Sequence, residues 1–358
     1  MSLYGLLLYL YTNAQPSAHF ADSIRTRYHI PELAYAVVSS DEVIELNVSG
    51  VQQYGTQHMA TVNDRFRIGS NTKAVTAFIA ALLVQQGKIG WHTRFFDLCP
   101  ELKAGSNKAY HQLTLEDLLS FRAPLFAYTY TYSRPRKQDF KGDDAQQRYA
   151  FTQWFFRQAP VPMNDGIQFS NLGYVAAGLM MERASGKDYK TLVLELGRQY
   201  GISFGFGPPA ASGAGQPWGH NDQLQAEAPA DNYKLNWLLA AGNINVSLPD
   251  YLKFIQEQLR GLNGKSAALS RETFRFLHFG RPQFALGWFH DTDETGAPYS
   301  HNTGNPGSFL SKVYVFPERN RAFILLANVQ SEEAEAGMEL LFAELKRADR
   351  LTAEKPVR

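Results

Sequence analysis

The sequence has a single cysteine, Cys99, among its 358 residues. One cysteine excludes an intrachain disulfide, a thiolate metal cluster and a zinc ribbon. We therefore interpret Cys99 as a small buried hydrophobic residue. The nine histidines are scattered, without the His-x-x-x-His spacing of a helical metal site. We expect neither a metal ion nor a cofactor.

An excess of charge of one sign is also missing. The chain has 35 Lys and Arg residues against 34 Asp and Glu residues, a formal net charge of +1. No basic run could follow a phosphate backbone, which excludes a nucleic-acid partner on electrostatic grounds. With 44% hydrophobic and 19% charged residues, the chain can bury one large core or two moderate ones. The expected partner is a small-molecule or peptide substrate, and the oligomeric state stays open.

Long hydrophobic runs are absent as well. The apolar stretch LYGLLLYLY (3–11) is too short to span a bilayer as a helix. Together with the following TNAQPSA it resembles the apolar part and cleavage region of an export signal, although it lacks the usual positive start. We interpret residues 1–20 as an export-signal remnant, or alternatively as an N-terminal helix that packs on the domain. The first interpretation predicts a periplasmic or secreted protein, and the second leaves the cytoplasm open.

The most informative feature that is present is Ser70 with Lys73, three residues later, at the start of a segment patterned as a long amphipathic helix. One helical turn separates positions i and i+3, so the lysine amine can reach the serine hydroxyl. A neutral lysine can take the serine proton, which requires burial to lower its pKa from about 10.4 to roughly 7 to 8. The free N–H groups of a helix start would also favour an oxyanion.

A Ser-x-x-Lys pair alone has an ordinary alternative. At average composition about one or two such pairs are expected in a chain of this length. An unremarkable helix start is therefore a competing interpretation. The flanks of Ser70 are more specific, with an aromatic-basic-Ile-Gly lead-in and apolar residues at helical spacing behind it.

Other segments extend the pattern beyond this pair. They are LTLEDLLS (113–120), QFSNLGYVAAGLMMERASGKDY (168–189), AAGNINVSLPDYLKF (240–254), FALGW (284–288) and HNTGNPG (301–307). In type and order they resemble the landmarks of serine hydrolases related to class C β-lactamases and penicillin-binding proteins. The resemblance covers roughly residues 20 to 345.

In that family the Ser-x-x-Lys pair is joined by Tyr-x-Asn, whose tyrosine helps move protons and whose asparagine holds the substrate amide. This chain has Phe169, Ser170 and Asn171 there. The resemblance assigns substrate binding to Asn171, which could alternatively cap the next helix. Phenylalanine has no ionisable oxygen, so Lys73 would act more nearly alone unless Ser170 or the aromatic loop 126–132 supplies a hydroxyl.

The family's third motif, Lys-Thr-Gly or His-x-Gly on a strand facing the serine, fits in two registers. The first, which we favour because it keeps a basic residue, puts His301 at the basic position and makes Gly304 the second oxyanion donor, with Thr303 where glycine is usual. The second puts Asn302 at the basic position and Asn305 at the donor. A histidine is only partly charged near neutral pH, which weakens recognition of a substrate carboxylate.

These motifs predict a serine hydrolase that forms a covalent acyl-enzyme on an ester, an amide or a D-amino-acid peptide. Because two of the three motifs depart from the family pattern, we expect poor β-lactamase activity. The alternative is a catalytically silent, penicillin-binding-like module that binds a peptide or a cell-wall ligand.

The strand and helix patterns complete the prediction. Strands are expected at 33–38, 43–48, 284–289, 309–316 and 322–329, with helix caps at Thr114, Ser247 and Ser331. Strands at both ends predict an α/β (α+β) domain from residues 21–90 and 270–350, with a mostly helical region, 91–269, inserted. The family fold, β-lactamase/transpeptidase-like, has this form: an antiparallel sheet flanked by helices beside a helical region.

Overall fold

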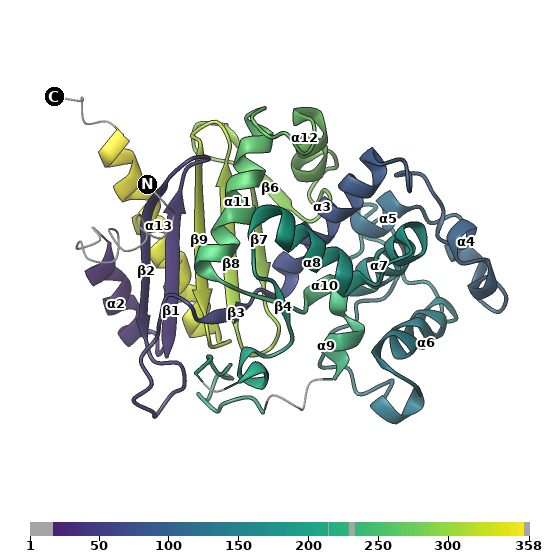
Figure 1. Ribbon diagram of the computed structural model, residues 1–358, viewed down its shortest axis with the longest axis horizontal. Helices are drawn as coiled ribbons and strands as arrows, with labels where there is room; N and C mark the ends of the chain where they lie inside the picture. The colour runs from purple at the N-terminus through teal and green to yellow at the C-terminus, as the bar shows by residue number, and fades with distance from the viewer. Residues whose placement is uncertain (1–16, 214, 229–232, 354–358) are drawn as a thin grey trace.

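A six-stranded antiparallel sheet forms one half of the molecule (Figure 1). The structure is a computed structural model that describes residues 17–213, 215–228 and 233–353. The strand order is β2-β1-β9-β8-β7-β6. The strands are β1 (Glu32–Val38), β2 (Val43–Gly50), β6 (Phe289–Thr292), β7 (Pro298–Gly304), β8 (Leu310–Phe316) and β9 (Arg321–Ala327). The sheet thus joins both ends of the chain, and the predicted fold class is confirmed.

Both faces of this sheet are covered, so its central strands are buried along their whole length. Successive side chains of a strand point to opposite faces. In β1, Leu33 and Tyr35 contact one hydrophobic core, and Ala34 and Ala36 contact the other. Two-sided burial explains why the β1 sequence is almost continuously apolar instead of alternating.

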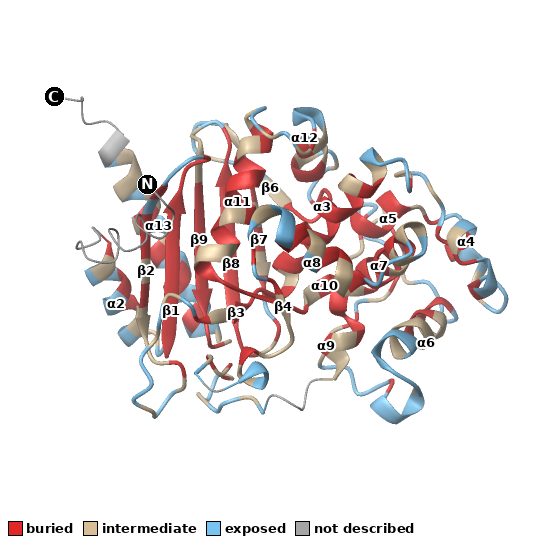
Figure 2. Cartoon of the chain, in the orientation of Figure 1, coloured by how far each residue is buried: buried red, intermediate tan, exposed pale blue. Residues whose placement is uncertain are grey.

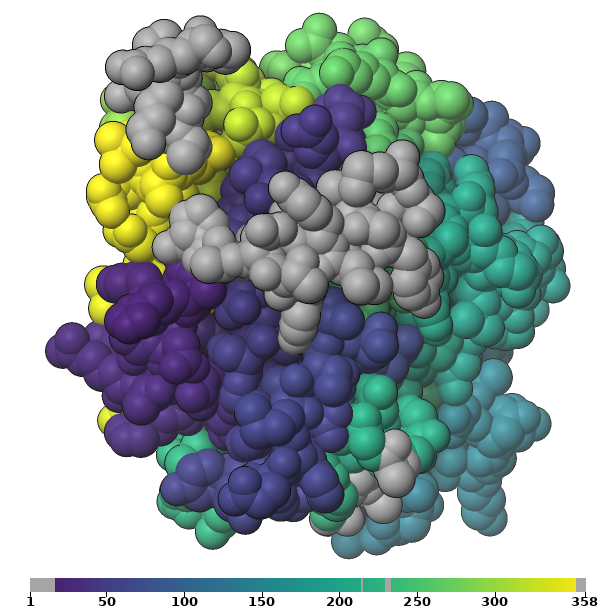
Figure 3. Space-filling view, turned by 60° about the vertical axis from the view of Figure 1, so that its left-hand side comes forward, coloured from purple at the N-terminus to yellow at the C-terminus, as the bar shows by residue number. Residues whose placement is uncertain are grey.

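Two helices from the ends of the chain cover one face of the sheet. They are α2 (Ala18–Arg27) and α13 (Glu332–Ala353), which contact each other as well as the strands. Figure 3 shows these terminal segments, coloured purple and yellow, side by side on the surface. The opposite face is covered by α11 (Leu248–Leu262), which contacts β1, β8 and β9.

The other half of the molecule is mainly helical (Figure 1). Its helices are α3 (Thr72–Gln85), α4 (Phe95–Leu98), α5 (Leu115–Leu119), α6 (Asp144–Phe156), α7 (Asn171–Ser185), α8 (Tyr189–Tyr200), α9 (Lys234–Trp237) and α10 (Leu239–Gly242). A further helix, α12 (Arg271–Phe279), packs beside β6. One continuous core extends from the sheet into these helices. The division into domains at residues 90 and 270 therefore stays a proposal.

Helix α3 lies at the centre of that core. Eleven of its fourteen residues are buried, and it is coloured almost wholly as buried in Figure 2. A helix with one solvent face was expected here, and that expectation is wrong because α3 is enclosed by α7, α8, α10 and α12. The enclosure matters for the site, since Lys73 belongs to this helix.

A second sheet of three short strands lies next to α3. Its order is β3-β5-β4, from β3 (Arg65–Arg67), β5 (Ile244–Ser247) and β4 (Gly205–Phe206). The pairing of β3 with β5 is antiparallel. It fixes the chain just before Ser70 against the segment that follows α10.

The local predictions had mixed outcomes. Thr114 caps α5 in a capping box with Asp117, and the Ser331 hydroxyl accepts a hydrogen bond from a backbone amide of α13, as predicted. Ser247 precedes α11 but makes no side-chain cap, and the Asp250 carboxylate accepts hydrogen bonds from Lys253 and from the Ser203 backbone amide instead of completing a capping box. The strand predicted over 284–289 is wrong, since regular pairing begins only at Phe289.

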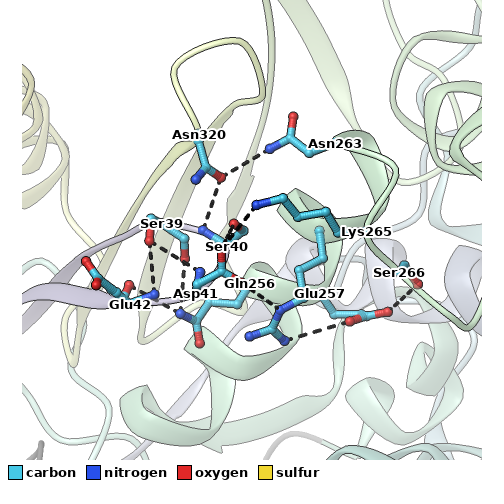
Figure 4. A network of polar contacts seen from close by, with 11 residues as sticks. Ser39, Ser40, Asp41, Glu42, Gln256, Glu257, Asn263, Lys265, Ser266 and Asn320 are labelled. Atoms are coloured by element: carbon cyan, nitrogen blue, oxygen red, sulfur yellow. Dashed lines mark hydrogen bonds and ion pairs between the residues drawn. The ribbon is translucent and has the colours of Figure 1, made fainter.

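A polar network ties the turn between β1 and β2 to the rest of the sheet (Figure 4). The Gln256 amide, on α11, donates to the Ser39 and Glu42 carbonyls at 3.0 and 3.2 Å. The side-chain Oδ1 of Asn320, in the turn before β9, accepts from the Ser40 backbone amide at 3.1 Å. The network holds three segments together that are far apart in sequence.

Candidate active site

Ser70 lies on a short 3-10 turn, Gly69–Asn71, between β3 and α3. Gly69 has a φ of +50°, and a Cβ atom there would lie 2.7 Å from the Asn305 amide nitrogen and 2.8 Å from the Gly304 carbonyl carbon. Both the backbone conformation and the lack of space require glycine. The serine turn is therefore pressed directly against the end of β7.

Side-chain hydrogen bonds to the neighbouring strand β8 also hold this turn. The Asn71 amide donates to Ser311 Oγ at 2.7 Å, and Ser311 Oγ donates to the Ile68 carbonyl at 2.7 Å. Ser311 belongs to β8, so the central sheet itself positions the serine. Such support from packed strands is what a precisely placed nucleophile needs.

Lys73 lies one turn further along and reaches Ser70, as the i, i+3 spacing predicts. Its Nζ is 2.9 Å from Ser70 Oγ. The same Nζ donates to Asn171 Oδ1 and to the Ala241 carbonyl, both at 2.8 Å. It also lies 5.4 Å from the centre of the Tyr174 ring. Each of these neighbours is neutral.

The surroundings of Lys73 determine its charge. The residue is 3% exposed, and no ion pair between Lys73 and a carboxylate exists among the described residues. Burial without a counter-ion favours the neutral amine. It lowers the pKa of Lys73 to about 7. At neutral pH a large fraction of the amine is thus able to accept a proton.

Asn171 is the first residue of α7, and both polar atoms of its side chain have a partner. Its Oδ1 accepts from Lys73, and its Nδ2 donates to the Tyr128 carbonyl at 2.6 Å. The helix cap is Ser170, whose Oγ accepts from the Leu172 amide and donates to the Phe126 carbonyl. Asn171 therefore positions Lys73 and does not cap the helix.

Neither of the two hydroxyl sources considered from the sequence, Ser170 and the aromatic loop 126–132, places a tyrosine-like hydroxyl beside Lys73 in the described structure. Phe169 is 50% exposed beside the serine. Ser170 Oγ is occupied by the Phe126 carbonyl, as above. Tyr128 presents its backbone to the site, while its ring packs among Tyr132, Phe151 and other aromatic residues.

The end of β7 resolves which third-motif residues lie near the serine. Asn302 donates from Nδ2 to the Gly287 carbonyl at 2.8 Å and to the Ser70 carbonyl at 3.3 Å. Thr303 lines the cavity next to it. These are residues of the second register. β6 pairs with β7 only as far as His301, so the edge beyond it is open towards Ser70.

The structure does not bring His301 into the same group. Its ring stacks between Phe289 and Tyr314, with centroids 5.7 and 6.1 Å away. Among the described residues, the lining of the cavity includes Asn302 and Thr303 but not His301. Burial lowers the pKa of His301, which further reduces its charge. The first register, with His301 as the basic residue, is not the arrangement found here.

Gly304 is packed against the serine turn. A Cβ on Gly304 would lie 1.9 Å from the Ile68 carbonyl oxygen, and Gly304 pairs with Ser311 in the ladder between β7 and β8. Its role in this arrangement is close approach of two backbones. The next residue, Asn305, has its amide nitrogen beside Gly69.

Ser70, Lys73 and Asn171 open into one cavity of about 290 Å³ between the helical half and the sheet. The other lining residues are Phe121, Ala127, Tyr128, Thr129, Phe169, Ser170, Phe284, Phe289, Asn302 and Thr303. The volume is within the range that accommodates a small organic group. Three segments distant in sequence thus meet at one concave site.

Comparison with known proteins agrees with this geometry. A family model described as Beta-lactamase matches residues 18–346. The chain belongs to the beta-lactamase family. The resemblance inferred from the motifs is therefore confirmed over almost the whole sequence.

Two curated relatives illustrate the range of the family. Penicillin-binding protein 4 of Amycolatopsis lactamdurans is 26% identical over 328 residues, covering 86% of this chain and 83% of that protein. Unguisins hydrolase ungD' of Aspergillus campestris is 25% identical over 336 residues, covering 88% of this chain. The match spans 62% of the length of the unguisins hydrolase.

Solved structures share the fold. An octameric penicillin-binding protein homologue from Pyrococcus abyssi aligns with a TM-score of 0.73 at 16% identity, over 91% of this chain and 76% of that chain. The D-alanine carboxypeptidase AmpC from Burkholderia cenocepacia aligns with a TM-score of 0.70 at 20% identity, over 90% and 96%.

Two other expectations concern the chain as a whole. Cys99 is fully buried, as expected of a small hydrophobic residue. Within the part of the chain that is described, no helix is both long and apolar enough to cross a lipid bilayer. The export-signal interpretation concerns residues 1–20, of which 1–16 lie outside the described residues.

Sequence reasoning missed several residues of the site. The phenyl rings of Phe121, Phe284 and Phe289 line the cavity. The Ala241 carbonyl is one of the acceptors around Lys73. Phe284 and Ala241 lie within the family-like segments 284–288 and 240–254, so their neighbourhood could be marked from the sequence. The direction in which these two residues face could not be predicted from the sequence.

Proposed function

We propose that this chain is a serine hydrolase that works through an acyl-enzyme on Ser70. The observation that carries the proposal is the 2.9 Å separation of Lys73 Nζ and Ser70 Oγ, with the lysine amine buried among neutral groups. A serine hydroxyl becomes a useful nucleophile when a base beside it takes its proton. Lys73, with a pKa of about 7, is such a base.

The reaction proceeds in two halves. In the first, the neutral Lys73 amine takes the Ser70 proton as Oγ attacks the substrate carbonyl carbon, giving a tetrahedral oxyanion. The amides of Ser70 and Asn305 are the two donors that we propose for this oxyanion. The ammonium of Lys73 then returns the proton to the leaving alcohol or amine. In the second half, Lys73 takes a proton from water as the water attacks the acyl-enzyme carbonyl. The bond between that carbonyl carbon and Ser70 Oγ then breaks, Lys73 returns the proton to Oγ, and the acid is released.

The substrate class follows from what the site lacks. We propose the second register, in which Asn302 takes the position of the family's basic residue; its side chain donates to backbone carbonyls and carries no charge. Phe169 supplies no proton to a departing β-lactam nitrogen. We therefore propose an ester, an amide or a D-amino-acid peptide as substrate, with poor β-lactamase activity. The relatives described above, a penicillin-binding protein and an unguisins hydrolase, support a hydrolase of this general kind.

The location remains part of the proposal. The apolar stretch 3–11 and the segment behind it favour export, hence a periplasmic or secreted enzyme.

The first test is covalent labelling of the serine. Wild type and Ser70→Ala are exposed to a fluorophosphonate, with a penicillin in parallel, and their intact masses are measured. We expect an adduct on wild type that is absent from Ser70→Ala. If neither reagent labels wild type while circular dichroism shows a folded protein, the acyl-enzyme proposal fails.

A silent binding module is the second candidate, and the observation that favours it is phenylalanine at the position of the family's proton-relay tyrosine. Phe169→Tyr separates the two candidates. Because Phe169 is half exposed, the change should leave stability within about 0.5 kcal/mol. An enzyme that lacks only this hydroxyl gains rate, whereas a binding module gains none.

A further inference from the structure

Four phenyl rings line the cavity and contact one another in a closed cycle. Phe121 stacks on Phe284 with centroids 4.1 Å apart, and Phe284 meets Phe289 at 4.8 Å. Phe289 meets Phe169 at 5.7 Å, and Phe169 returns to Phe121 at 5.3 Å. We call these four residues the phenylalanine cluster.

The phenylalanine cluster is assembled from both halves of the molecule. Phe121 follows α5 and Phe169 precedes α7, on the helical side. Phe284 follows α12 and Phe289 begins β6, on the sheet side. Aromatic pairs at these separations stabilise one another beyond the area they bury. The cycle therefore fixes the apolar wall of the cavity where the two halves meet.

Two members have features unusual for purely structural residues. Phe121 has a φ of +61°, a left-handed conformation uncommon for a bulky side chain. Backbone in sparsely populated regions often occurs at ligand sites. Phe169 exposes half of its surface, although burying a phenyl ring is worth roughly 1.5 to 3 kcal/mol. An exposed ring beside a nucleophile can be covered by a bound ligand.

Charge is scarce on the same surface. Among the described lining residues Lys73 is the only one with an ionisable amine, guanidinium or carboxyl group. Its Nζ is already surrounded by Ser70, Asn171 and Ala241. The nearby Arg122 donates away from the cavity, to the carbonyls of Ser120, Pro282 and Phe284. A carboxylate entering the cavity would meet no free cation there.

We propose that the phenylalanine cluster selects substrates with an aromatic or bulky apolar acyl group, and that the site accepts neutral compounds in preference to those bearing a free carboxylate. This inference rests on the proposed acyl-enzyme function. The acyl group packs on the four rings, Ser70 Oγ bonds to its carbonyl carbon, and the bond to the leaving alcohol breaks as Lys73 returns the proton. Apolar recognition replaces the charge recognition that a basic residue at position 302 would give.

The test compares p-nitrophenyl esters that differ only in the acyl group: acetate, 3-phenylpropionate and hemisuccinate. We expect kcat/KM for the phenylpropionate to exceed that for the acetate by about tenfold or more, with the hemisuccinate slowest. Equal values for the three esters, or a preference for the hemisuccinate, would overturn the inference.

Two variants test whether the cavity phenylalanines cause the preference for the larger acyl group. Phe169→Ala and Phe289→Ala should each reduce the ratio of phenylpropionate to acetate to about threefold or less. Phe20→Ala is the matched control, because Phe20 is a partly exposed phenylalanine on α2, on the far face of the sheet. Its ratio should equal that of wild type. A ratio unchanged in both cavity variants would contradict the assignment.

A second pair of variants tests the role of charge. Thr303 lines the cavity and is only partly buried, so Thr303→Arg introduces a cation there. It should raise the hemisuccinate rate relative to the acetate rate by about tenfold, since opposite charges attract strongly in a poorly hydrated site. Thr303→Met, of comparable bulk and no charge, should leave that ratio unchanged. Equal ratios in the two variants count against the inference.

The outcomes separate this inference from the proposed function. Labelling rates are measured with two fluorophosphonates, one carrying a methyl and one a phenylpropyl substituent. If both label Ser70 at the same rate, the proposed acyl-enzyme function is supported, but the phenylalanine cluster does not select the acyl group. If neither labels it, the proposed function fails and this inference fails with it.

Discussion

Two lysines of this protein are equally buried and have opposite surroundings. Lys73 and Lys312 are each 3% exposed. Lys312, on β8, lies 2.9 Å from Glu335 and 2.5 Å from Glu339, both on α13. Lys73 meets only neutral oxygens. Lys312 is the centre of an ion-pair cluster on the face of the sheet that α2 and α13 cover, and Lys73 faces the cavity.

The difference shows that burial alone does not define the role of a charged residue. A buried cation between two carboxylates is held by Coulomb attraction and ties β8 to α13. A buried amine without a counter-ion gains nothing from charge and is driven towards its neutral form. That none of the described carboxylates pairs with Lys73 is thus as much a part of the site as the presence of Ser70.

The largest expected effect is loss of rate when the unpaired lysine is removed. Lys73→Met should lower kcat/KM on a p-nitrophenyl ester by about 10³-fold or more, because Lys73 is the only amine or carboxylate among the described residues that line the cavity with Ser70. Lys312→Met, the same substitution at the paired lysine, should change kcat/KM by less than about threefold. Steady-state kinetics on the two variants makes the comparison. Equal losses would mean that Lys73 is only structural.

The next effect is a pH dependence of the rate. Because the neutral amine is the active form, kcat/KM should fall about tenfold per pH unit below pH 7 and level off above it. A profile measured from pH 5 to 9 shows this. A flat profile over that range would remove Lys73 as the base.

The same shift affects stability with a definite sign. The pKa of Lys73 is lower in the folded protein, so the unfolded chain binds more protons between about pH 7 and 10. The free energy of unfolding attributable to Lys73 should therefore rise with pH in this window, by at most about 1.4 kcal/mol per unit. Urea unfolding of wild type and Lys73→Met isolates it. A parallel pH dependence in both proteins would contradict the expectation.

The smallest effect concerns the paired lysine. Lys312→Met should lower the free energy of unfolding by about 1 to 2 kcal/mol, because the two glutamates that lose their partner are half exposed and can be hydrated. Glu339→Gln should cost less, since Glu335 still pairs with the lysine. Urea denaturation at pH 7 measures both. A loss for Glu339→Gln larger than for Lys312→Met would show that the cluster is organised differently.

The sequence predicted a good part of the fold, because local patterns carry it. Alternating and continuous apolar runs marked β1, β2, β8 and β9 within a residue or two. The capping box at Thr114 was visible because it involves neighbours three residues apart. The strand expected at 284–289 failed because its aromatic residues serve the cavity wall instead of a ladder.

In the candidate site, too, local features could be predicted from the sequence and long-range features could not. The pairing of Ser70 with Lys73 could be predicted, since one helical turn fixes their reach. The register of β7 could not, because His301, Asn302 and Thr303 are adjacent in sequence and only the pairing with β6 and β8 decides which of them faces the serine. Basic character favoured His301, yet the strand turns its ring between Phe289 and Tyr314.

The sequence by itself determined the family and predicted Ser70 as nucleophile with Lys73 as its base, because these depend on residue types at short spacings within segments of the chain. Tertiary structure decided the rest. The neutral partners of Lys73 and the closed cycle of four phenyl rings along the cavity both arise from segments far apart in sequence; Phe121 and Phe289, for example, are 168 residues apart. Such long-range contacts set the local dielectric and the shape of the pocket, and no pattern within a single helix or strand contains them.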